Sequence, residues 1–162
     1  PVTTQLCLQL LEKHIRPDIK VIDVGCGSGI LSIAALKFGA AQVLAVDVDR
    51  QAVNATLENT GINDLKWGVL ETGKGSVNEI RAGQFTIQEA PLVMVNILAS
   101  IIIDLFGEGL THLVQENGTL LLSGILKPQE VDVLQLAQEE GFTLIERLSD
   151  GDWVSLALGK YQ

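Results

Sequence analysis

Short apolar runs alternate with amphipathic segments along most of the chain. The apolar runs predict buried strands at 20–24, 42–46, 92–95, 119–123, 142–148 and 153–158, with a weaker strand at 65–70. Apolar residues three or four positions apart predict helices at 3–14, 29–38, 50–59, 100–115 and 127–140. The run Leu92-Val93-Met94-Val95 has no polar face, which is typical of a parallel strand covered by helices on both sides.

This order of elements predicts an α/β fold. We expect a three-layer α/β/α sandwich around a doubly wound, mostly parallel seven-stranded sheet. The turn Asp150-Gly151-Asp152 is a hairpin signal, so the last strand should run antiparallel to its neighbour. No repeat or linker interrupts the 162 residues, which therefore predict a single domain. Ligands of such sheets bind at the carboxyl ends of the strands, where the strand order reverses.

The segment 71–89 departs from this pattern. It contains Gly73, Gly75 and Gly83, many polar residues and little periodicity, so we expect a long loop with room for one helical turn. Loops of this length are often functional or mobile. Glu71 is a candidate for an adenine contact, although a solvated carboxylate is the simpler interpretation.

Three closely spaced glycines follow the first predicted strand. The segment 21–30 runs from this strand through Gly25, Gly27 and Gly29 into a helix. Glycine permits sharp bends and lets a ligand approach the backbone without a Cβ in the way. Asp47 ends the second strand 22 residues after Gly25, a spacing that brings a carboxylate to a ribose diol. We expect a nucleoside cofactor; the alternative is a turn that only packs a helix on a strand.

The glycine spacing narrows the choice of cofactor. The pattern G-x-G-x-G departs from the dinucleotide pattern G-x-G-x-x-G because Ile30 stands at the third glycine position, and no P-loop sequence follows. Asp23 would repel a pyrophosphate but suits a cation. S-adenosylmethionine has a ribose, an amino group, a positive sulfonium and no phosphate. The segment resembles motif I of the S-adenosylmethionine-dependent methyltransferases, and Asp47 resembles their acidic ribose-binding residue.

Composition limits the possible partners. The formal charge of −9 argues against broad binding to nucleic-acid backbones and suits a basic protein partner, although solubility alone also explains it. Cys7 and Cys26 lack metal-ligand spacing, so we expect no metal and reduced, cytoplasmic thiols. A catalytic Cys26 has no histidine nearby in sequence to support it. The apolar region 90–106 is interrupted by Asn96 and Asp104, so no membrane span is predicted.

Asn96 directly follows the fourth predicted strand. In a doubly wound sheet this position lies beside the glycine turn after the first strand. Many methyltransferases carry at this point a motif that begins with Asn or Asp and holds the amine to be methylated. A cap for the helix from Ser100 is the alternative. Ser123 is expected at the same edge, where a core or turn hydroxyl is the simpler interpretation.

The sequence Asn96-Ile97-Leu98-Ala99 differs from the Asn-Pro-Pro-Tyr of amide and nucleobase methyltransferases. It resembles PrmA, the methyltransferase family of large-subunit ribosomal protein eleven. Similar pieces occur at 3–8, 21–35, 45–49 and 122–126 and at Trp153. The resemblance covers essentially the whole chain except 71–89, and it implies a Rossmann-like methyltransferase fold.

The resemblance also implies site residues and an activity. It implies methylation of lysine side chains and the N-terminal amine of a ribosomal protein, with Asn96 orienting the amine as the catalytic residue. Together with the motif itself it gives six residues expected to contact S-adenosylmethionine: Thr4, Asp23, Gly25, Gly27, Asp47 and Asn96.

Two departures from the family affect these expectations. Pro1-Val2 stands where the family has His-Pro, so the segment that closes over the cofactor differs there. The family also carries an N-terminal substrate-recognition domain, and this chain starts after it. We therefore expect residues 1–162 to be a catalytic domain whose ribosomal-protein partner needs the other domain for recognition. We expect a cytoplasmic monomer without direct nucleic-acid contacts.

Three alternatives stay open. In the first alternative, the chain is a class I methyltransferase that acts on another substrate, such as arginine or a small molecule. The pair of glutamates that arginine methyltransferases use is, however, not evident after the fourth strand. Otherwise it is a module that binds S-adenosylmethionine without turnover. A nicotinamide oxidoreductase is disfavoured by Ile30.

Overall fold

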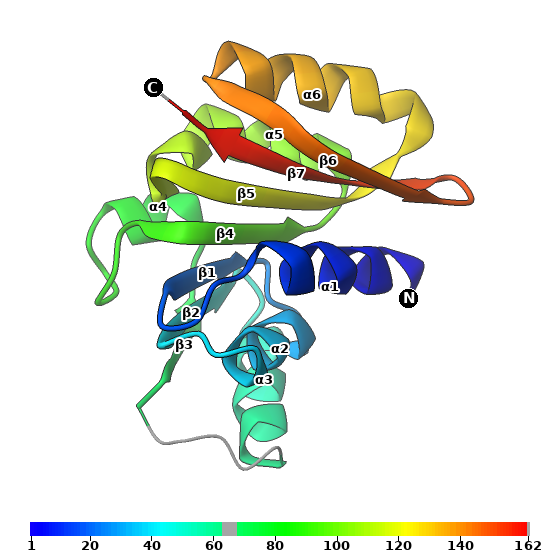
Figure 1. Ribbon diagram of the computed structural model, residues 1–162. Helices are drawn as coiled ribbons and strands as arrows, with labels where there is room; N and C mark the ends of the chain where they lie inside the picture. The colour runs from blue at the N-terminus through cyan, green and yellow to red at the C-terminus, as the bar shows by residue number, and fades with distance from the viewer. Residues whose placement is uncertain (63–67, 162) are drawn as a thin grey trace.

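The computed structural model describes residues 1–62 and 68–161. The strands in this part of the chain are β1 (Lys20–Val24), β2 (Gln42–Asp47), β3 (Leu70–Lys74), β4 (Ala90–Asn96), β5 (Val114–Leu126), β6 (Phe142–Asp150) and β7 (Trp153–Lys160). They form one sheet in the order β3-β2-β1-β4-β5-β7-β6 (Figure 1). Only β7 runs antiparallel to its neighbours in this described sheet, so the predicted fold and the C-terminal hairpin are confirmed.

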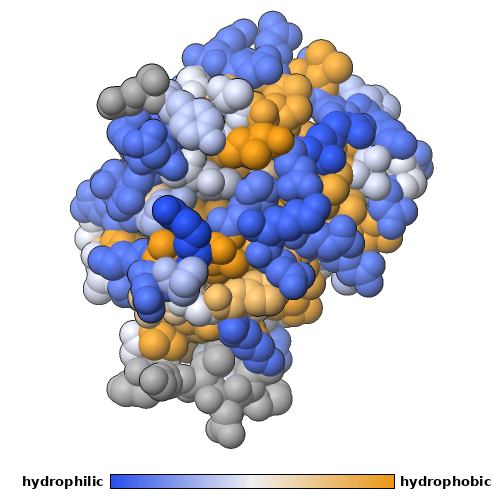
Figure 2. All heavy atoms as spheres, in the orientation of Figure 1, coloured by the Kyte–Doolittle hydropathy of each residue, from blue (hydrophilic) through white to orange (hydrophobic). Residues whose placement is uncertain are grey.

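Helices cover both faces of the sheet. The α-helices are α1 (Val2–His14), α2 (Ile30–Lys37), α3 (Arg50–Ile62), α4 (Val77–Arg81), α5 (Ala99–Glu108) and α6 (Glu130–Glu139), with 3-10 turns η1 (Leu110–Leu113) and η2 (Lys127–Gln129). One layer contains α1, α2 and α3, and the other contains α4, α5 and α6 (Figure 1). In the space-filling view of the same face, hydrophobic residues show as separate patches among hydrophilic ones (Figure 2). Within the described residues, no helix has the length and apolar character needed to cross a membrane.

The strands at the centre of the sheet are buried on both faces. In β1, Val21 belongs to the core cluster that contains Leu10 and Leu11 of α1, while Ile22 belongs to the cluster on the α5 side. This two-sided burial explains the continuous apolar runs, because each strand has no solvent-facing side. Asp23 is the buried exception in β1, with a relative exposure of 1%.

The strand order reverses between β1 and β4. From β1 the chain continues outward to β2 and β3, whereas β4 starts the other half of the sheet. The parallel registers pair Val24 with both Val46 and Val95, and Asn96 with Ser123. The carboxyl ends of β1, β2, β4 and β5 therefore lie along one edge, which is where a ligand site is expected.

The expected long loop at 71–89 is wrong in part. Its first residues form β3, whose Glu71 pairs in register with Leu44, and Val77–Arg81 forms α4. The Ser76 amide donates to Glu79 Oε1 at 2.8 Å, which caps that helix. As the terminal strand of the sheet, β3 keeps polar, half-buried side chains and so shows no apolar alternation. The strand expected at 65–70 overlaps β3 only at Leu70, and residues 63–67 lie outside the described residues.

The helix expected at 100–115 is also shorter than predicted. It ends at Glu108, because Gly109 adopts a left-handed conformation (φ 103°) that terminates the helix. The pair Asn117-Gly118, a common turn sequence, lies inside β5, which begins at Val114. Asn117 has a positive φ of 64°, and the pairing with β4 shifts register nearby, so the turn signal marks an irregularity within one strand.

Candidate functional site

The glycine turn after β1 is held against β2 and against the residue after Asn96. Gly25 and Gly27 have φ values of 77° and 54°, which glycine adopts without strain. The Gly25 amide donates to the Val46 carbonyl at 2.8 Å. A Cβ on Gly25 would lie 2.9 Å from Ile97 Cγ2, whereas a Cβ on Gly27 would meet nothing within 4 Å. The backbone is thus tightly packed at Gly25 and open to a ligand at Gly27.

Asp47 is anchored by one backbone amide on each carboxylate oxygen. Oδ2 accepts a hydrogen bond from the Gly27 amide at 3.0 Å, and Oδ1 accepts one from the Asp49 amide at 2.9 Å. Asp49 in turn accepts a hydrogen bond from the Gln51 amide at 2.9 Å and so caps the N-terminus of α3. Each oxygen of Asp47 keeps acceptor capacity, so the oriented carboxylate can accept two further donors, such as two vicinal hydroxyls.

Asp23 ties β1 to α2. Its carboxylate accepts a hydrogen bond from Ser32 Oγ at 2.6 Å. Burial raises the pKa of Asp23 to about 6, and the charge of Asp47 adds to the rise, while the Ser32 hydrogen bond opposes it. Through this contact Asp23 helps to order the glycine turn that lies between β1 and α2. A direct contact of Asp23 with a cofactor stays a prediction.

Asn96 and Thr4 come together at the end of β4. The Asn96 side-chain amide donates to Thr4 Oγ1 at 3.3 Å, which joins β4 to α1. The residue at the N-cap of α5 is Leu98, so the alternative of Asn96 as a helix cap is wrong. The structure therefore brings two expected cofactor residues into contact, although 92 positions separate them in the sequence.

Ser123 is a buried hydroxyl that supports α1. It donates to the Thr3 carbonyl at 2.9 Å and shares a hydrogen bond of 2.5 Å with Ser155 Oγ. Because Thr3 precedes Thr4, this pair of serines fixes the first turn of α1 beside Asn96. The interpretation of Ser123 as a core hydroxyl is the one that fits.

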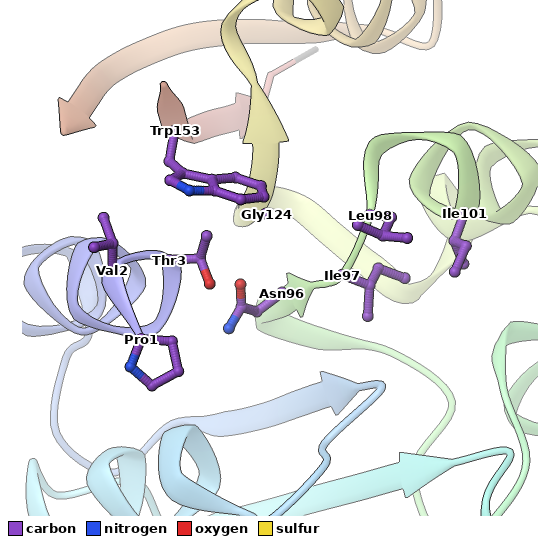
Figure 3. A pocket seen from close by; sticks show the side chains of 9 residues that line it. All are labelled: Pro1, Val2, Thr3, Asn96, Ile97, Leu98, Ile101, Gly124 and Trp153. Atoms are coloured by element: carbon purple, nitrogen blue, oxygen red, sulfur yellow. The ribbon is translucent and has the colours of Figure 1, made fainter. Parts of the chain in front are cut away.

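A mostly apolar pocket of about 450 Å³ opens next to Asn96. Its described lining comes from α1, the β4–α5 junction, β5 and β7, and consists of Pro1, Val2, Thr3, Asn96, Ile97, Leu98, Ile101, Gly124 and Trp153 (Figure 3). Leu98 and Ile101 are exposed, at 58% and 43%, and the Trp153 indole lies across the pocket from them. Asn96 is thus a polar group at one side of an apolar cavity.

Gly124 forms the close contact that shapes this pocket. It has a φ of +90°, and a Cβ there would lie 2.3 Å from the Ile97 carbonyl oxygen. The Ile97 amide donates to the Ser123 carbonyl at 3.1 Å. Ile97 is therefore held between Gly25, which faces its side chain, and Gly124, which faces its backbone. Sequence reasoning did not assign Gly124 or Trp153 to the site; both stood only within the segments of family resemblance.

Glu71 and Cys26, the two other candidate site residues, have contacts that do not fit a binding or catalytic role. Glu71, a candidate for an adenine contact, accepts hydrogen bonds from the Thr86 amide at 3.1 Å and from its hydroxyl at 2.5 Å. Burial raises the pKa of the Cys26 thiol to about 12, so a catalytic thiolate there is disfavoured. The described residues contain no group of three or more His, Cys, Asp or Glu that could hold a metal ion.

Comparisons with known proteins agree with this geometry. A family model described as ribosomal protein L11 methyltransferase (PrmA) matches residues 2–161. The ribosomal protein L11 methyltransferase of Acetivibrio thermocellus is 36% identical over 156 residues, covering 96% of this chain and 47% of the relative. That of Thermotoga neapolitana is 40% identical over 156 residues, covering 96% of this chain and 56% of the relative. The chain thus spans about half the length of the curated relatives that it matches.

The chain also resembles solved structures, one of which is named for the same family. The crystal structure of the ribosomal protein L11 methylase from Lactobacillus delbrueckii subsp. bulgaricus has a TM-score of 0.82 and 31% identity, covering 99% of this chain and 80% of that chain. A putative RNA methyltransferase from Pyrococcus horikoshii has a TM-score of 0.77 at 20% identity, covering 99% of this chain and 85% of that chain, and shows the shared fold alone. The resemblance inferred from the sequence motifs is confirmed. The chain belongs to the ribosomal protein L11 methyltransferase (PrmA) family.

Proposed function

We propose that this chain binds S-adenosyl-L-methionine at the glycine turn and transfers its methyl group to amino groups of a ribosomal protein. The observation that carries the proposal is the placement of Asp47 and Asn96. The Asp47 carboxylate is oriented against Gly27, and Asn96 contacts Thr4 at the mouth of an apolar pocket. At this edge of the sheet, the Asp47 side thus suits the ribose of the cofactor, and the Asn96 side suits the amine that accepts the methyl group.

The turn has the chemistry that this cofactor needs. Asp47 accepts hydrogen bonds from the two ribose hydroxyls, and the open backbone at Gly27 lets the cofactor approach closely. The carboxylates of Asp23 and Asp47 give the site a negative potential, which favours a sulfonium and an ammonium and disfavours a pyrophosphate. Thr4 and Asn96 close the site from the α1 side. When bound, the cofactor supplies the electrophilic methyl group, so the chain's own task is to position the reactants.

The apolar pocket suits the stem of a lysine side chain. Leu98, Ile101 and Trp153 offer apolar surface to methylene groups, and the Asn96 side chain accepts a hydrogen bond from the amine and orients it. A lysine amine has a reference pKa of about 10.4 and must be neutral to attack. Desolvation in this pocket lowers that pKa. None of the described lining residues carries a carboxylate or an imidazole, so the proton leaves to solvent before the methyl transfer.

The relatives are named for ribosomal protein L11, and we propose a protein of that kind as the substrate. In this proposal residues 1–162 form the catalytic domain, and a separate recognition domain brings the whole substrate to the site. The reaction takes place in the cytoplasm, where ribosomal proteins are made, and the catalytic domain acts as a monomer.

Transfer of labelled methyl groups tests the proposed function. The chain is incubated with S-adenosyl-L-methionine labelled on the methyl group, and with either purified ribosomal protein L11 or n-butylamine. Because a separate recognition domain is proposed to bring L11 to the site, we expect slow label in L11, as methylated lysine and methylated N-terminal amine, which increases when the recognition domain of a relative is supplied. Label in n-butylamine would show amine methylation, and no label in L11 even with that domain present would contradict the proposed substrate. Cofactor binding with no labelled amine would instead support a binding module.

A further inference from the structure

Thr56 of α3 contacts three residues of the glycine turn: Cys26, Gly27 and Gly29. Its side chain is buried, and its hydroxyl donates to the Gly27 carbonyl at 3.0 Å. The same hydroxyl lies 3.3 Å from Cys26 Sγ. Its methyl carbon would lie 2.9 Å from a Cβ on Gly29, so the two residues are closely packed. A residue 29 positions away from Gly27 therefore contacts most of the turn.

The direction of these hydrogen bonds is determined by the available protons. A threonine hydroxyl has one hydrogen, which it donates to the Gly27 carbonyl. The contact with Cys26 must then run from the thiol to Thr56 Oγ1. Burial, followed by the negative charge of Asp23, raises the pKa of Cys26 to about 12, so the thiol keeps its proton for this role. The turn is thus tied to α3 by a complete donor–acceptor chain.

Asn59, one helical turn further along α3, extends the contact. Its side-chain amide donates to the Ser28 carbonyl at 2.8 Å. Residues three apart share one face of a helix, so Thr56 and Asn59 hold two consecutive carbonyls of the turn. On the other side of Gly27, the amide donates to Asp47. Both peptide groups of Gly27 are therefore fixed by the unit formed by β2 and α3.

This arrangement controls the direction of backbone donors in the turn. A trans peptide is planar, so holding the Gly27 carbonyl also fixes the direction of the Ser28 amide. Gly27 has a φ of 54°, and without side-chain contacts of its own it has wide conformational freedom. The hydroxyl of Thr56 removes that freedom before a ligand binds, which lowers the entropy cost of binding.

We propose that Thr56 is a positioning residue for the cofactor, acting through the Gly27 carbonyl rather than by touching the ligand. The proposal rests on the proposed function, because it assumes that the turn binds S-adenosyl-L-methionine. Asn59 acts in the same way through Ser28, with Thr56 as the principal contact because it holds the more open residue of the turn.

Two substitutions separate the hydroxyl of Thr56 from its packing. Thr56→Val keeps the shape against Gly29 and removes the hydrogen bond, whereas Thr56→Ser keeps the hydroxyl and removes the methyl group. The matched control is Thr60→Val, because Thr60 donates to the Thr56 carbonyl at 2.6 Å within the same helix. For each variant, the Kd of S-adenosylhomocysteine is measured by calorimetry and the midpoint of thermal unfolding by circular dichroism.

We expect Thr56→Val to raise the Kd about tenfold, the effect of losing one orienting hydrogen bond. Thr56→Ser and Thr60→Val should stay within about threefold of the unsubstituted chain. A Thr56→Val variant that melts earlier but binds with unchanged Kd would overturn the proposal and leave Thr56 a structural residue. If Thr56→Val does not fold, Asn59→Ala must show the raised Kd, and an unchanged Kd there overturns the proposal. Absence of binding to the unsubstituted chain would instead contradict the proposed function itself.

Discussion

The side-chain amide of Asn96 lies 3.3 Å from the hydroxyl of Thr4, although 92 positions separate the two residues. This contact joins the end of β4 to the first turn of α1, which the hydroxyl of Ser123 holds through the Thr3 carbonyl. The polar group beside the apolar pocket is therefore oriented by a helix at the start of the chain. Substitutions in the first turn of α1 and at the end of β4 should therefore both affect turnover through the orientation of Asn96.

Replacing Asn96 with alanine should reduce turnover more than cofactor binding. The acceptor amine loses an orienting group, and poor placement of reactants costs about tenfold to a hundredfold in rate. We expect kcat to fall by that amount and the Kd of S-adenosylhomocysteine to rise only a few-fold. Steady-state kinetics and calorimetry make the comparison. Asn54→Ala, at an exposed position of α3, is the control. Equal, small changes in both quantities would remove Asn96 from the catalytic role.

Trp153 should determine how well the acceptor binds. Its indole supplies the apolar wall across the pocket from Leu98 and Ile101 (Figure 3). Loss of such a ring should raise the KM for a lysine-containing peptide about tenfold in Trp153→Ala, while Trp153→Phe keeps part of the surface and part of the affinity. The Kd of the cofactor should be unchanged in both variants. A raised cofactor Kd with unchanged acceptor KM would place Trp153 on the cofactor side.

Gly124→Ala should destabilise the protein more than an alanine at another left-handed glycine. A new Cβ at Gly124 would lie 2.3 Å from the Ile97 carbonyl, whereas one at Gly141 (φ +99°) would meet nothing within 4 Å. Backbone strain costs both variants about 1–2 kcal/mol, and overpacking at Gly124 adds about 1–3 kcal/mol. Urea unfolding measures the difference. Equal losses of stability would mean that Ile97 moves aside without cost.

Asp23 should make the stability depend on pH in an unusual direction. Burial raises its pKa from 3.8 to about 6, so between these values the folded state binds more protons than the unfolded state. Stability from this group is therefore greatest below about pH 4 and falls as the pH rises to about 6. The shift corresponds to about 3 kcal/mol at most.

The variant Asp23→Asn tests this dependence, because asparagine can still accept the hydrogen bond from Ser32. Free energies of unfolding are measured in urea at several pH values. Relative to the unsubstituted chain, Asp23→Asn should gain stability as the pH rises from 4 to 7. The exposed Asp104→Asn is the control and should show no such trend. A constant difference for Asp23→Asn would show that Asp23 ionises normally.

Much of the site could be predicted because its signals are local. The glycine turn and Asp47 each follow a short apolar strand, and parallel strands place their carboxyl ends along one edge. This rule predicted that Asn96 lies next to the glycine turn, although it says nothing about the contacts of the Asn96 side chain. Thr4 was expected at the site only from the family resemblance, and its contact with Asn96 was not predicted, since nothing in the pattern of α1 shows which residue reaches β4.

Other features had no signal in the sequence. The strand β3 is an edge strand, so its residues Glu71-Thr72-Gly73-Lys74 show no apolar alternation. Their sequence therefore predicted a loop. Thr56 is one polar residue in an amphipathic helix, and only the packing of α3 against the turn reveals its contact with Gly27. Such contacts depend on the relative placement of two elements, which periodicity does not describe.

The most direct test of the proposed site is calorimetric titration of S-adenosyl-L-methionine into the unsubstituted chain, Asp47→Ala and Asp49→Ala. Asp49 is the matched control, because its side chain caps α3 while its backbone amide still holds residue 47. Hydrogen bonds to a charged group contribute about 1.5–3 kcal/mol each, so we predict that Asp47→Ala raises the Kd at least about tenfold. Asp49→Ala should bind almost as the unsubstituted chain does. A folded Asp47→Ala that binds S-adenosyl-L-methionine with unchanged affinity would contradict the assignment of this edge as the cofactor site.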